Sequence, residues 1–453
     1  MMVPSTGAGL SICILLWFGM IRFVRQAHGF RQLLDDLGPR KARGFILGSR
    51  SAATASSSSS HNESALSREE QDNESVENTS SDRLGSPRRA PFYKIYYNDV
   101  YEVKLPPNHR FPMGKYRKTR LVIQDWVDKQ LLAAPNSAGD GHHQPEEKEP
   151  TKVRCEFQVS PLSTVEDLST THDPSYVKRF MMGNMTKEEL RNIGFPWGSD
   201  VVDRHRSSVG GTVAAACSAV DEWLLQLQQQ GEIKGNRNQY DRSSLIAPWG
   251  AHVAGGTHHA FYDYGEGFSV FSDIAVASNV VLKRYPEQIE KILIIDLDVH
   301  QGNGNAALFR DRPEVFTFSI HCSANYFSEK QDSDLDIELP AGCTDETYLM
   351  TLHHWLQRLK RDVNCDLIFF QAGVDVLETD RLGRLALTPD GVRRRNEMVY
   401  KFAKDANVPL IITMGGGYPK GGDWPSVVKA HADVYIGAYR FLANVDDKII
   451  SGR

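Results

Sequence analysis

The sequence predicts an α/β protein, with one parallel β-sheet that carries helices on both of its faces. Short apolar runs alternate with longer helical patterns from residue 153 to the C-terminus, as in strands joined by crossover helices. Several runs are continuously apolar and β-branched, which is typical of strands buried on both faces. Polar residues follow directly after several of these runs, at the strand ends where open α/β sheets bind ligands.

The expected elements follow from these patterns. We expect a first strand over residues 91–97 and then a helix that continues to about Leu132. Further strands are predicted at 155–159, 292–299, 315–321, 367–373 and 410–414. Further helices are predicted at 212–229, 271–284, 345–363, 389–405 and 424–430. Residues 91–450 are therefore predicted to form one domain, in which residues 134–152 are a mobile loop insertion.

Residues 1–90 are predicted to be an extension outside this domain. The first 21 residues carry no charged side chain, but their strictly apolar part is shorter than the ~20 residues of a membrane span. Residues 22–50 are basic and residues 51–60 are mostly Ser and Ala, the composition of an organellar transit peptide. Residues 51–90 are polar and are expected to be disordered. We therefore expect a plastid or a mitochondrion, with a signal anchor or a non-targeting extension as alternatives.

Charge and cysteine usage exclude several classes of function. The chain has 52 Lys and Arg against 57 Asp and Glu and no Lys/Arg-rich block, so direct nucleic-acid binding is not predicted. Six cysteines are scattered without a Cys-x-x-Cys pair, which argues against a disulfide framework and against a thiolate zinc site. We expect free, buried thiols in a reducing compartment.

The segment KILIIDLDVHQGNG, residues 291–304, carries the strongest chemical signal. Asp296, Asp298 and His300 follow four aliphatic residues at a spacing of two, so in a strand they would point to one face. A buried strand has no favourable place for two unpaired carboxylates and an imidazole. A bound metal ion resolves that conflict, and the segment therefore predicts a metal site.

Three other segments carry reactive side chains beside glycines or strand ends. His258 and His259 lie in GGTHHA and suit a general base and acid, although a structural histidine pair is equally compatible. Asp375 follows the strand at 367–373, as a third oxygen ligand or as a turn cap. Tyr418 follows three glycines, as an oxyanion donor or as a packed turn residue. The His-His pairs at 142–143 and 353–354 do not suit a shared site.

Together, the motifs GGTHH, DLDVHQGNG, QAGVD and GGGY, in this order and at these distances, resemble the zinc-dependent histone deacetylase family. The resemblance runs from about residue 92 to 445. It is closest to the class IV branch and its bacterial relatives, which share QGNG where class I enzymes have HGDG. It implies an arginase/deacetylase-like fold and hydrolysis of N6-acyl-lysine in histones or other proteins. A role as a chromatin regulator, alone or in a protein complex, is part of that implication.

The resemblance also implies a role for each motif residue. One Zn²⁺ would be held by Asp298, His300 and Asp375, with a coordination position left open for catalysis. His258 and His259 would face the water that attacks the substrate. Tyr418 would donate a hydrogen bond to the developing oxyanion.

Two further residues would support the histidines. Asp296 would orient His258, and Asn303 stands where class I enzymes place a carboxylate beside the residue equivalent to His259. A neutral amide stabilises an imidazolium less than a carboxylate does, so we expect a lower pKa for His259. The division of acid and base roles between the two histidines stays open.

The implied tunnel for acyl-lysine has Gly267 and Phe268 as one wall and Tyr326 or Phe327 as the other. The family's structural monovalent cation, K⁺, is implied at two places. The first would use Asp296, Ser319 and Ile320 with the backbone of Asp298 and His300, and the second the backbone near Phe309, Arg312 and Val315.

Other functions stay open beside this one. An amidohydrolase of the same fold that acts on acetylated polyamines would carry acidic residues at the tunnel mouth, to meet the second ammonium group. A non-catalytic scaffold is disfavoured because every chemical residue is present. An arginase-type binuclear hydrolase needs further aspartates, which Gln301 and Asn303 do not supply. The resemblance makes nucleus and cytosol the alternative location.

Overall fold

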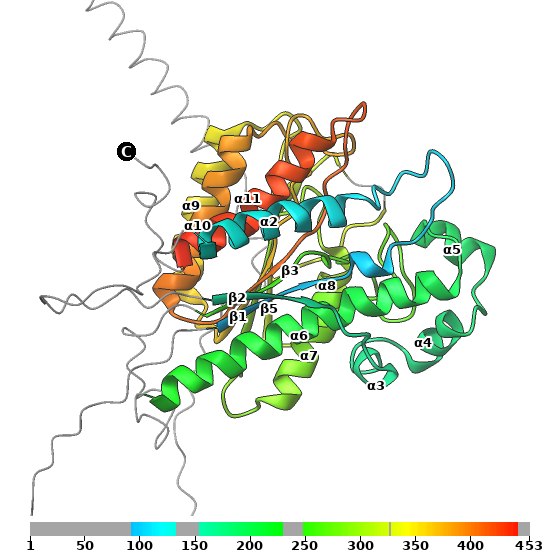
Figure 1. Cartoon of the computed structure of the whole chain (residues 1–453), viewed down its shortest axis with the longest axis horizontal. Coiled ribbons are helices and arrows are strands. Elements are labelled where there is room, and N and C mark those ends of the chain that lie inside the picture. The colour runs from blue at the N-terminus through cyan, green and yellow to red at the C-terminus, as the bar shows by residue number, and fades with distance from the viewer. Residues whose placement is uncertain (1–91, 133–153, 230–247, 326–327, 443–453) are drawn as a thin grey trace, which may run out of the picture.

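The computed structural model describes residues 92–132, 154–229, 248–325 and 328–442 (Figure 1). The predictions on residues 1–90, on residues 134–152 and on Tyr326 and Phe327 therefore lie outside the described residues. Within the described ranges, one eight-stranded sheet carries helices on both faces, and every strand pair in it is parallel. The predicted fold class is confirmed.

The sheet has the strand order β2-β1-β3-β8-β7-β4-β5-β6. The strands are β1 Phe92–Tyr97, β2 Arg154–Val159, β3 Trp249–His252, β4 Ile292–Asp296, β5 Val315–Cys322, β6 Leu335–Leu339, β7 Leu367–Gln371 and β8 Leu410–Thr413. The sequence did not predict β3 or β6. β3 has only four residues and includes a glycine, and β6 lies at the sheet edge, where its exposed face lets charged residues interrupt the apolar run.

The helices are η1 Asp99–Tyr101, α2 Lys115–Leu132, α3 Val165–Leu168, α4 Pro174–Met181, α5 Lys187–Ile193, α6 Ser199–Gln229, α7 Asp273–Arg284, α8 Asn303–Leu308, α9 Asp345–Asp362, α10 Pro389–Ala406 and α11 Trp424–Leu442. α6 begins at Ser199 rather than at 212. Gly210 and Gly211 weaken helix propensity there, but a Cβ at Gly210 would lie 2.0 Å from the Pro161 carbonyl oxygen. Close packing therefore explains glycine inside this helix.

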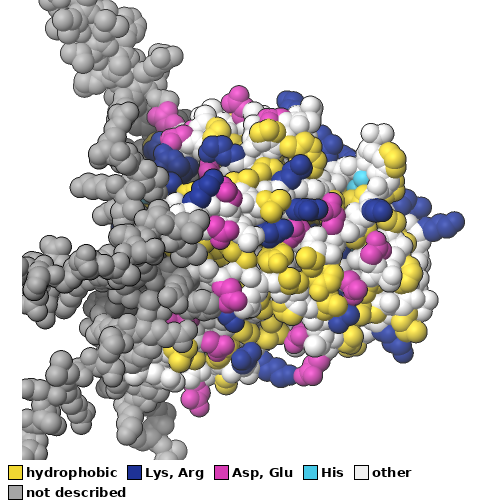
Figure 2. All heavy atoms as spheres, in the orientation of Figure 1, with side chains coloured by type: hydrophobic (Ala, Val, Ile, Leu, Met, Phe, Trp, Pro, Cys, Tyr) yellow, Lys and Arg dark blue, Asp and Glu magenta, His cyan; other side chains and the backbone are white. Residues whose placement is uncertain are grey.

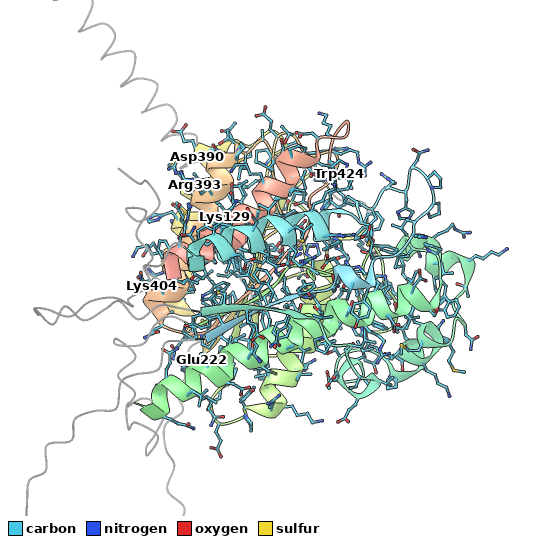
Figure 3. The ribbon with its side chains drawn as sticks, in the orientation of Figure 1. Lys129, Glu222, Asp390, Arg393, Lys404 and Trp424 are labelled. Carbon is cyan, nitrogen blue, oxygen red and sulfur yellow. The ribbon has the colours of Figure 1, made fainter. Side chains whose placement is uncertain are left out.

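Two layers of helices cover the sheet. Helices α6 and α7 lie on one face, and α2, α9, α10 and α11 lie on the other (Figure 1). In Figure 3, Lys129 of α2, Arg393 of α10 and Trp424 of α11 mark the second layer, whereas Glu222 of α6 lies across the sheet.

Alternate residues of the central strands fill the two cores. On β4, Ile292 and Ile294 pack with the α6–α7 layer, whereas Leu293 and Ile295 belong to the core on the opposite face. All four side chains are buried, which confirms a strand buried on both faces. The carboxyl end of β4 lies in the middle of the sheet, between β7 and β5. The site is therefore built on a rigid part of the fold.

The described cysteines, at positions 155, 217, 322, 343 and 365, are free thiols, as predicted. Four of them are buried and Cys155 is partly exposed. Cys13 lies outside the described residues. Among the described helices, none is both long enough and apolar enough to cross a membrane.

Candidate active site

Strand β4 ends where the acidic residues and the histidine of the segment 291–304 begin. β4 ends at Asp296 rather than at the predicted 299. Asp296 Oδ1 accepts a hydrogen bond from the Asp298 backbone N–H at 3.1 Å, and Asp298 Oδ1 accepts one from the His300 N–H at 3.0 Å. Each carboxylate thus binds the backbone two residues ahead, which competes with strand pairing. Turns, rather than strand alternation, bring Asp298 and His300 together, so the spacing-of-two argument holds only for Asp296.

Asp298, His300 and Asp375 form a buried cluster with metal-ligand geometry. His300 Nδ1 lies 3.1 Å from Asp298 Oδ1 and 3.3 Å from Asp375 Oδ2. The candidate ligand atoms lie within 4.8 Å of one another, and Asp375 Oδ2 is buried without a hydrogen bond. Tetrahedral zinc with bonds of about 2.0–2.2 Å places its ligand atoms roughly 3.3–3.6 Å apart. The three residues therefore fit a zinc ion.

The charge balance of the cluster also favours a cation. Burial, and then the neighbouring Asp298, raise the pKa of Asp375 to about 7. Burial opposes ionisation of His300, but the two neighbouring carboxylates, Asp298 and Asp375, raise its pKa to about 10. Two buried carboxylates this close repel each other, and a divalent cation between them would relieve that repulsion.

The glycine run before Tyr418 leaves space for the carboxylates. A Cβ at Gly416 would lie 1.9 Å from Asp375 Oδ2 and 2.8 Å from Asp298 Oδ2. The Gly416 backbone N–H donates to Asp298 Oδ2 at 2.8 Å, which fixes that carboxylate. Gly416 therefore serves the candidate ligands directly, because any side chain there would displace them.

The loop that carries the tandem histidines is tied to the start of α7. Asp273 is buried and accepts hydrogen bonds from the backbone N–H groups of Gly256 and Thr257, at 3.0 and 2.7 Å. His258 Nδ1 then lies 2.6 Å from Asp296 Oδ2. Asp296 thus holds His258, in the arrangement that the resemblance implies.

His259 is held by an amide whose orientation is fixed by its own partners. Asn303 Nδ2 donates to Glu266 Oε1 at 2.7 Å, so Asn303 Oδ1 is the atom that faces His259 Nδ1, at 2.8 Å. An amide oxygen only accepts, so His259 Nδ1 is the donor and carries the proton. His259 Nε2 is therefore left with a lone pair, which is the state that a general base needs.

The two histidines have opposite pKa shifts. Burial lowers the pKa of His258, but Asp296 and Asp298 outweigh burial and raise it to about 9. Burial, and then His258 and His300, lower the pKa of His259 well below its usual value. The pKa of His259 is therefore lowered, as expected. The main causes of this shift are burial and the neighbouring cations, rather than the amide of Asn303. In the metal-free protein these shifts favour a protonated His258 beside a neutral His259.

Tyr418 is a partly buried phenol at the edge of the cluster. Its backbone N–H donates to Asp380 Oδ2 at 2.6 Å, and its carbonyl accepts from the Arg381 N–H at 3.0 Å. Burial, and then Asp375 and Asp298, raise the pKa of its hydroxyl well above the usual value. Tyr418 is therefore a neutral hydrogen-bond donor.

Gly267 and Phe268 line the same cavity as the tandem histidines and Tyr418, while their role as the wall of an acyl-lysine tunnel stays a prediction. Phe268 has a φ of 69°, and its backbone N–H donates to the Ile193 carbonyl at 2.8 Å. A positive φ is costly for an aromatic residue, so the end of α5 holds Phe268 in place. The centroid of its ring lies 5.2 Å from that of Phe111 and 5.9 Å from that of Phe195. The sequence did not predict these two aromatic neighbours.

The predicted monovalent-cation residues fall into two groups. Asp296 and Ser319 are paired across β4 and β5, next to Ile320. Phe309, Arg312 and Val315 lie in one turn, in which the carbonyls of Phe309 and Arg312 accept backbone N–H groups at 3.1 Å. Both K⁺ sites stay a prediction.

Several supporting residues have no visible motif in the sequence. Lys115 is buried and its Nζ donates to the Gly415 carbonyl at 2.7 Å, which helps to fix the Tyr418 loop. Glu266, Asp273 and Asp380 hold Asn303, the histidine loop and Tyr418, respectively. These contacts join segments that are far apart in the chain, so the sequence gives little sign of them. Glu266 is the exception, because this carboxylate stands directly before Gly267, a residue already predicted in the tunnel wall.

Comparisons with known proteins identify the family of this chain. Residues 142–434 match the family described as the histone deacetylase domain. An uncharacterised protein of Picosynechococcus sp. is 37% identical over 72% of this chain and 93% of its own length. Histone deacetylase 2 of Arabidopsis thaliana is 34% identical over 38% of this chain and 45% of its own length. The crystal structure of the HDA15 HD domain superposes with a TM-score of 0.54 at 17% identity, covering 78% of this chain and 89% of that one. This chain belongs to the histone deacetylase domain family.

Proposed function

We propose that the chain hydrolyses the amide bond of N6-acyl-lysine in proteins, with one Zn²⁺ held by Asp298, His300 and Asp375. The observation that carries this proposal is that two of the candidate ligands, Asp298 and His300, line one cavity with the tandem histidines and Tyr418. Gly267 and Phe268 line the same cavity and the opening beside it. Membership of the deacetylase family supports a hydrolase. The class IV branch, suggested by QGNG, is part of the proposal.

Zinc, when bound, would polarise the acyl carbonyl and lower the pKa of the attacking water toward ~7. His259 Nε2 takes a proton from that water, because Asn303 keeps the other ring nitrogen protonated. Tyr418 donates its O–H to the oxyanion as the water oxygen adds to the carbonyl carbon. His258, whose protonated form is stabilised by the Asp296 carboxylate at 2.6 Å, donates a proton to the lysine nitrogen as the C–N bond breaks. The products are a carboxylate and free lysine.

Mass spectrometry would test this proposal. The zinc-loaded full-length chain is given peptides with acetyl-, butyryl- and myristoyl-lysine, and acetylated polyamines, with Asp298→Ala as the control. We expect deacylation of at least one lysine peptide and none by the variant. Turnover of polyamines alone would support the small-molecule amidohydrolase, and no turnover by zinc-bound protein would favour a scaffold or an activity that needs a partner in a protein complex.

We further propose that residues 1–60 direct the chain to a plastid or a mitochondrion, on the basis of their basic, Ser-rich composition. A fusion of these residues to a fluorescent protein should enter an organelle. A diffuse cytosolic or nuclear signal would contradict targeting.

A further inference from the structure

The mouth of the site is rimmed by arginines. The lining of this opening includes Arg110 from the loop before α2, Arg191 from α5, and Arg381 and Arg384 from the segment after β7. The same opening reaches His259, His300 and Tyr418, so it leads directly to the reactive groups. Among the described residues that line it, none is Asp or Glu. Four cations therefore surround one entrance.

These charges are exposed and not neutralised by the described part of the chain. All four arginines are exposed, and none forms an ion pair with a described residue. Arg381 donates to the Arg110 carbonyl, and Arg384 donates to the Ala324 carbonyl at 3.1 Å. Backbone carbonyls orient the two guanidinium groups and leave their charge in place.

Two acidic residues beside residues that line the opening are engaged in other contacts. Asp380 precedes Arg381, but its carboxylate is buried and accepts the backbone N–H groups of Leu382, Gly383 and Tyr418. Glu266 precedes Gly267, and its carboxylate accepts from Asn303 and Ser328. Lys and Arg side chains also project from the end of the molecule where α5 lies (Figures 1 and 2).

We propose that the substrates are acyl-lysines flanked by acidic residues, an inference that rests on the proposed function. With the acyl-lysine inserted, its chain neighbours lie over the mouth, because extended residues advance about 3.3–3.6 Å each. Three residues on either side thus stay within roughly 10 Å of the entrance, within reach of long arginine side chains. Guanidinium groups bind carboxylates with two parallel hydrogen bonds.

The same rim disfavours two other substrates. The second ammonium group of an acetylated polyamine would approach four arginines, with no carboxylate among the described residues that line the opening. A Lys/Arg-rich segment, such as a basic histone tail, would meet the same repulsion. The acidic mouth expected of a polyamine site is therefore replaced here by a basic one.

The test uses the zinc-loaded full-length chain and three peptides that share one acyl-lysine and differ in flanks: acidic, neutral or basic. We expect kcat/KM to fall in that order, with about a two- to fivefold change for each exposed arginine–carboxylate pair. The preference should shrink as salt rises from about 0.01 to 1 M, which shortens the Debye length from about 30 to about 3 Å.

A matched pair of variants locates the effect. Arg110→Gln with Arg191→Gln removes two rim charges whose side chains make no hydrogen bond to described residues. Arg117→Gln with Arg394→Gln removes two exposed charges outside the mouth. We expect the rim variant to lower the acidic-to-basic ratio of kcat/KM at least about fivefold, and the control to leave it unchanged.

The outcomes separate the two proposals. Equal turnover of the three peptides, or an acidic preference that neither salt nor the rim variant changes, would overturn the acidic-substrate inference alone. No turnover of any acyl-lysine peptide would reject the proposed function and the inference with it. Stronger inhibition by duplex DNA than by an acidic peptide would assign the rim to nucleic acid instead.

Discussion

The floor and the mouth of the site differ in almost every physical respect. The floor consists of buried carboxylates and imidazoles joined by contacts of 2.6–3.3 Å, on loops that follow interior strands of the sheet. The mouth consists of exposed arginines on three separate segments. Burial strengthens electrostatic interactions and keeps their geometry, whereas solvent screens the mouth. The floor is thus suited to chemistry and the mouth to choosing among substrates.

The largest effect is expected from removing a candidate ligand. Asp375→Asn should reduce bound zinc from one per chain to near zero. Loss of several kcal/mol of transition-state stabilisation corresponds to roughly 10³–10⁵-fold in kcat/KM. Metal analysis and kinetics measure both quantities. Asp366→Asn, a buried carboxylate at the opposite ends of the strands, is the control. Full zinc content in Asp375→Asn would contradict the ligand assignment.

Tyr418→Phe should lower kcat by about 10²–10³-fold with zinc content unchanged, because one oxyanion donor is lost. The backbone contacts of Tyr418 to Asp380 and Arg381 remain in this variant, so its loop should keep its position. A variant with normal kcat would show that the phenol packs without donating to the reaction.

The floor should respond to pH in the metal-free protein. His258 and His300 have pKa values raised to about 9 and about 10, above the ~6.5 of unfolded histidine. Their stabilisation is full below pH ~6.5 and is lost as pH rises through the folded values. The His258 part amounts to on the order of 3 kcal/mol of unfolding free energy.

Denaturant unfolding between pH 6.5 and 9 measures this loss. The pH dependence should persist at high salt, since buried pairs are little screened, in contrast to the mouth. In Asp296→Asn the pH dependence should be smaller, because the negative charge beside His258 is gone. If the free energy of unfolding depends on pH in that variant as it does in the wild type, Asp296 is not the residue that raises the pKa of His258.

The smallest effect on the floor is expected at its boundary with the surface. Glu266→Ala removes the acceptor that fixes the Asn303 amide, and supporting contacts of this kind are worth about 10–100-fold in activity. We expect roughly tenfold lower kcat with KM and zinc content unchanged. Ser328→Ala, which removes the other partner of Glu266, should have a weaker effect of the same kind.

The sequence predicted the floor far better than the mouth. Asp296, Asp298, His300 and Asn303 lie within eight residues of one strand end, so their motif is local and its chemistry can be inferred. The parallel sheet and its buried central strands followed from apolar periodicity in the same way.

The mouth of the site and the exact ends of several elements depend on tertiary contacts, which the sequence does not display. Arg110, Arg191 and Arg381 are far apart in the chain, and each resembles an ordinary surface charge until folding brings them to one opening. The end of β4 was predicted at 299 because side-chain acceptors at Asp296 and Asp298, which end the strand, have no apolar signature. Helix α6 likewise starts earlier than predicted because Gly210 is required there by close packing, and helix propensity alone does not take such packing into account.

Turnover in ¹⁸O-labelled water tests the central claim most directly. The zinc-loaded chain is mixed with an acyl-lysine peptide, and the masses of both products are measured by mass spectrometry. The proposed hydrolysis predicts one ¹⁸O atom in each released carboxylate and none in the lysine peptide, with no product from Asp298→Ala. A carboxylate without label, or an acyl group found on another acceptor, would contradict hydrolysis by water at this site.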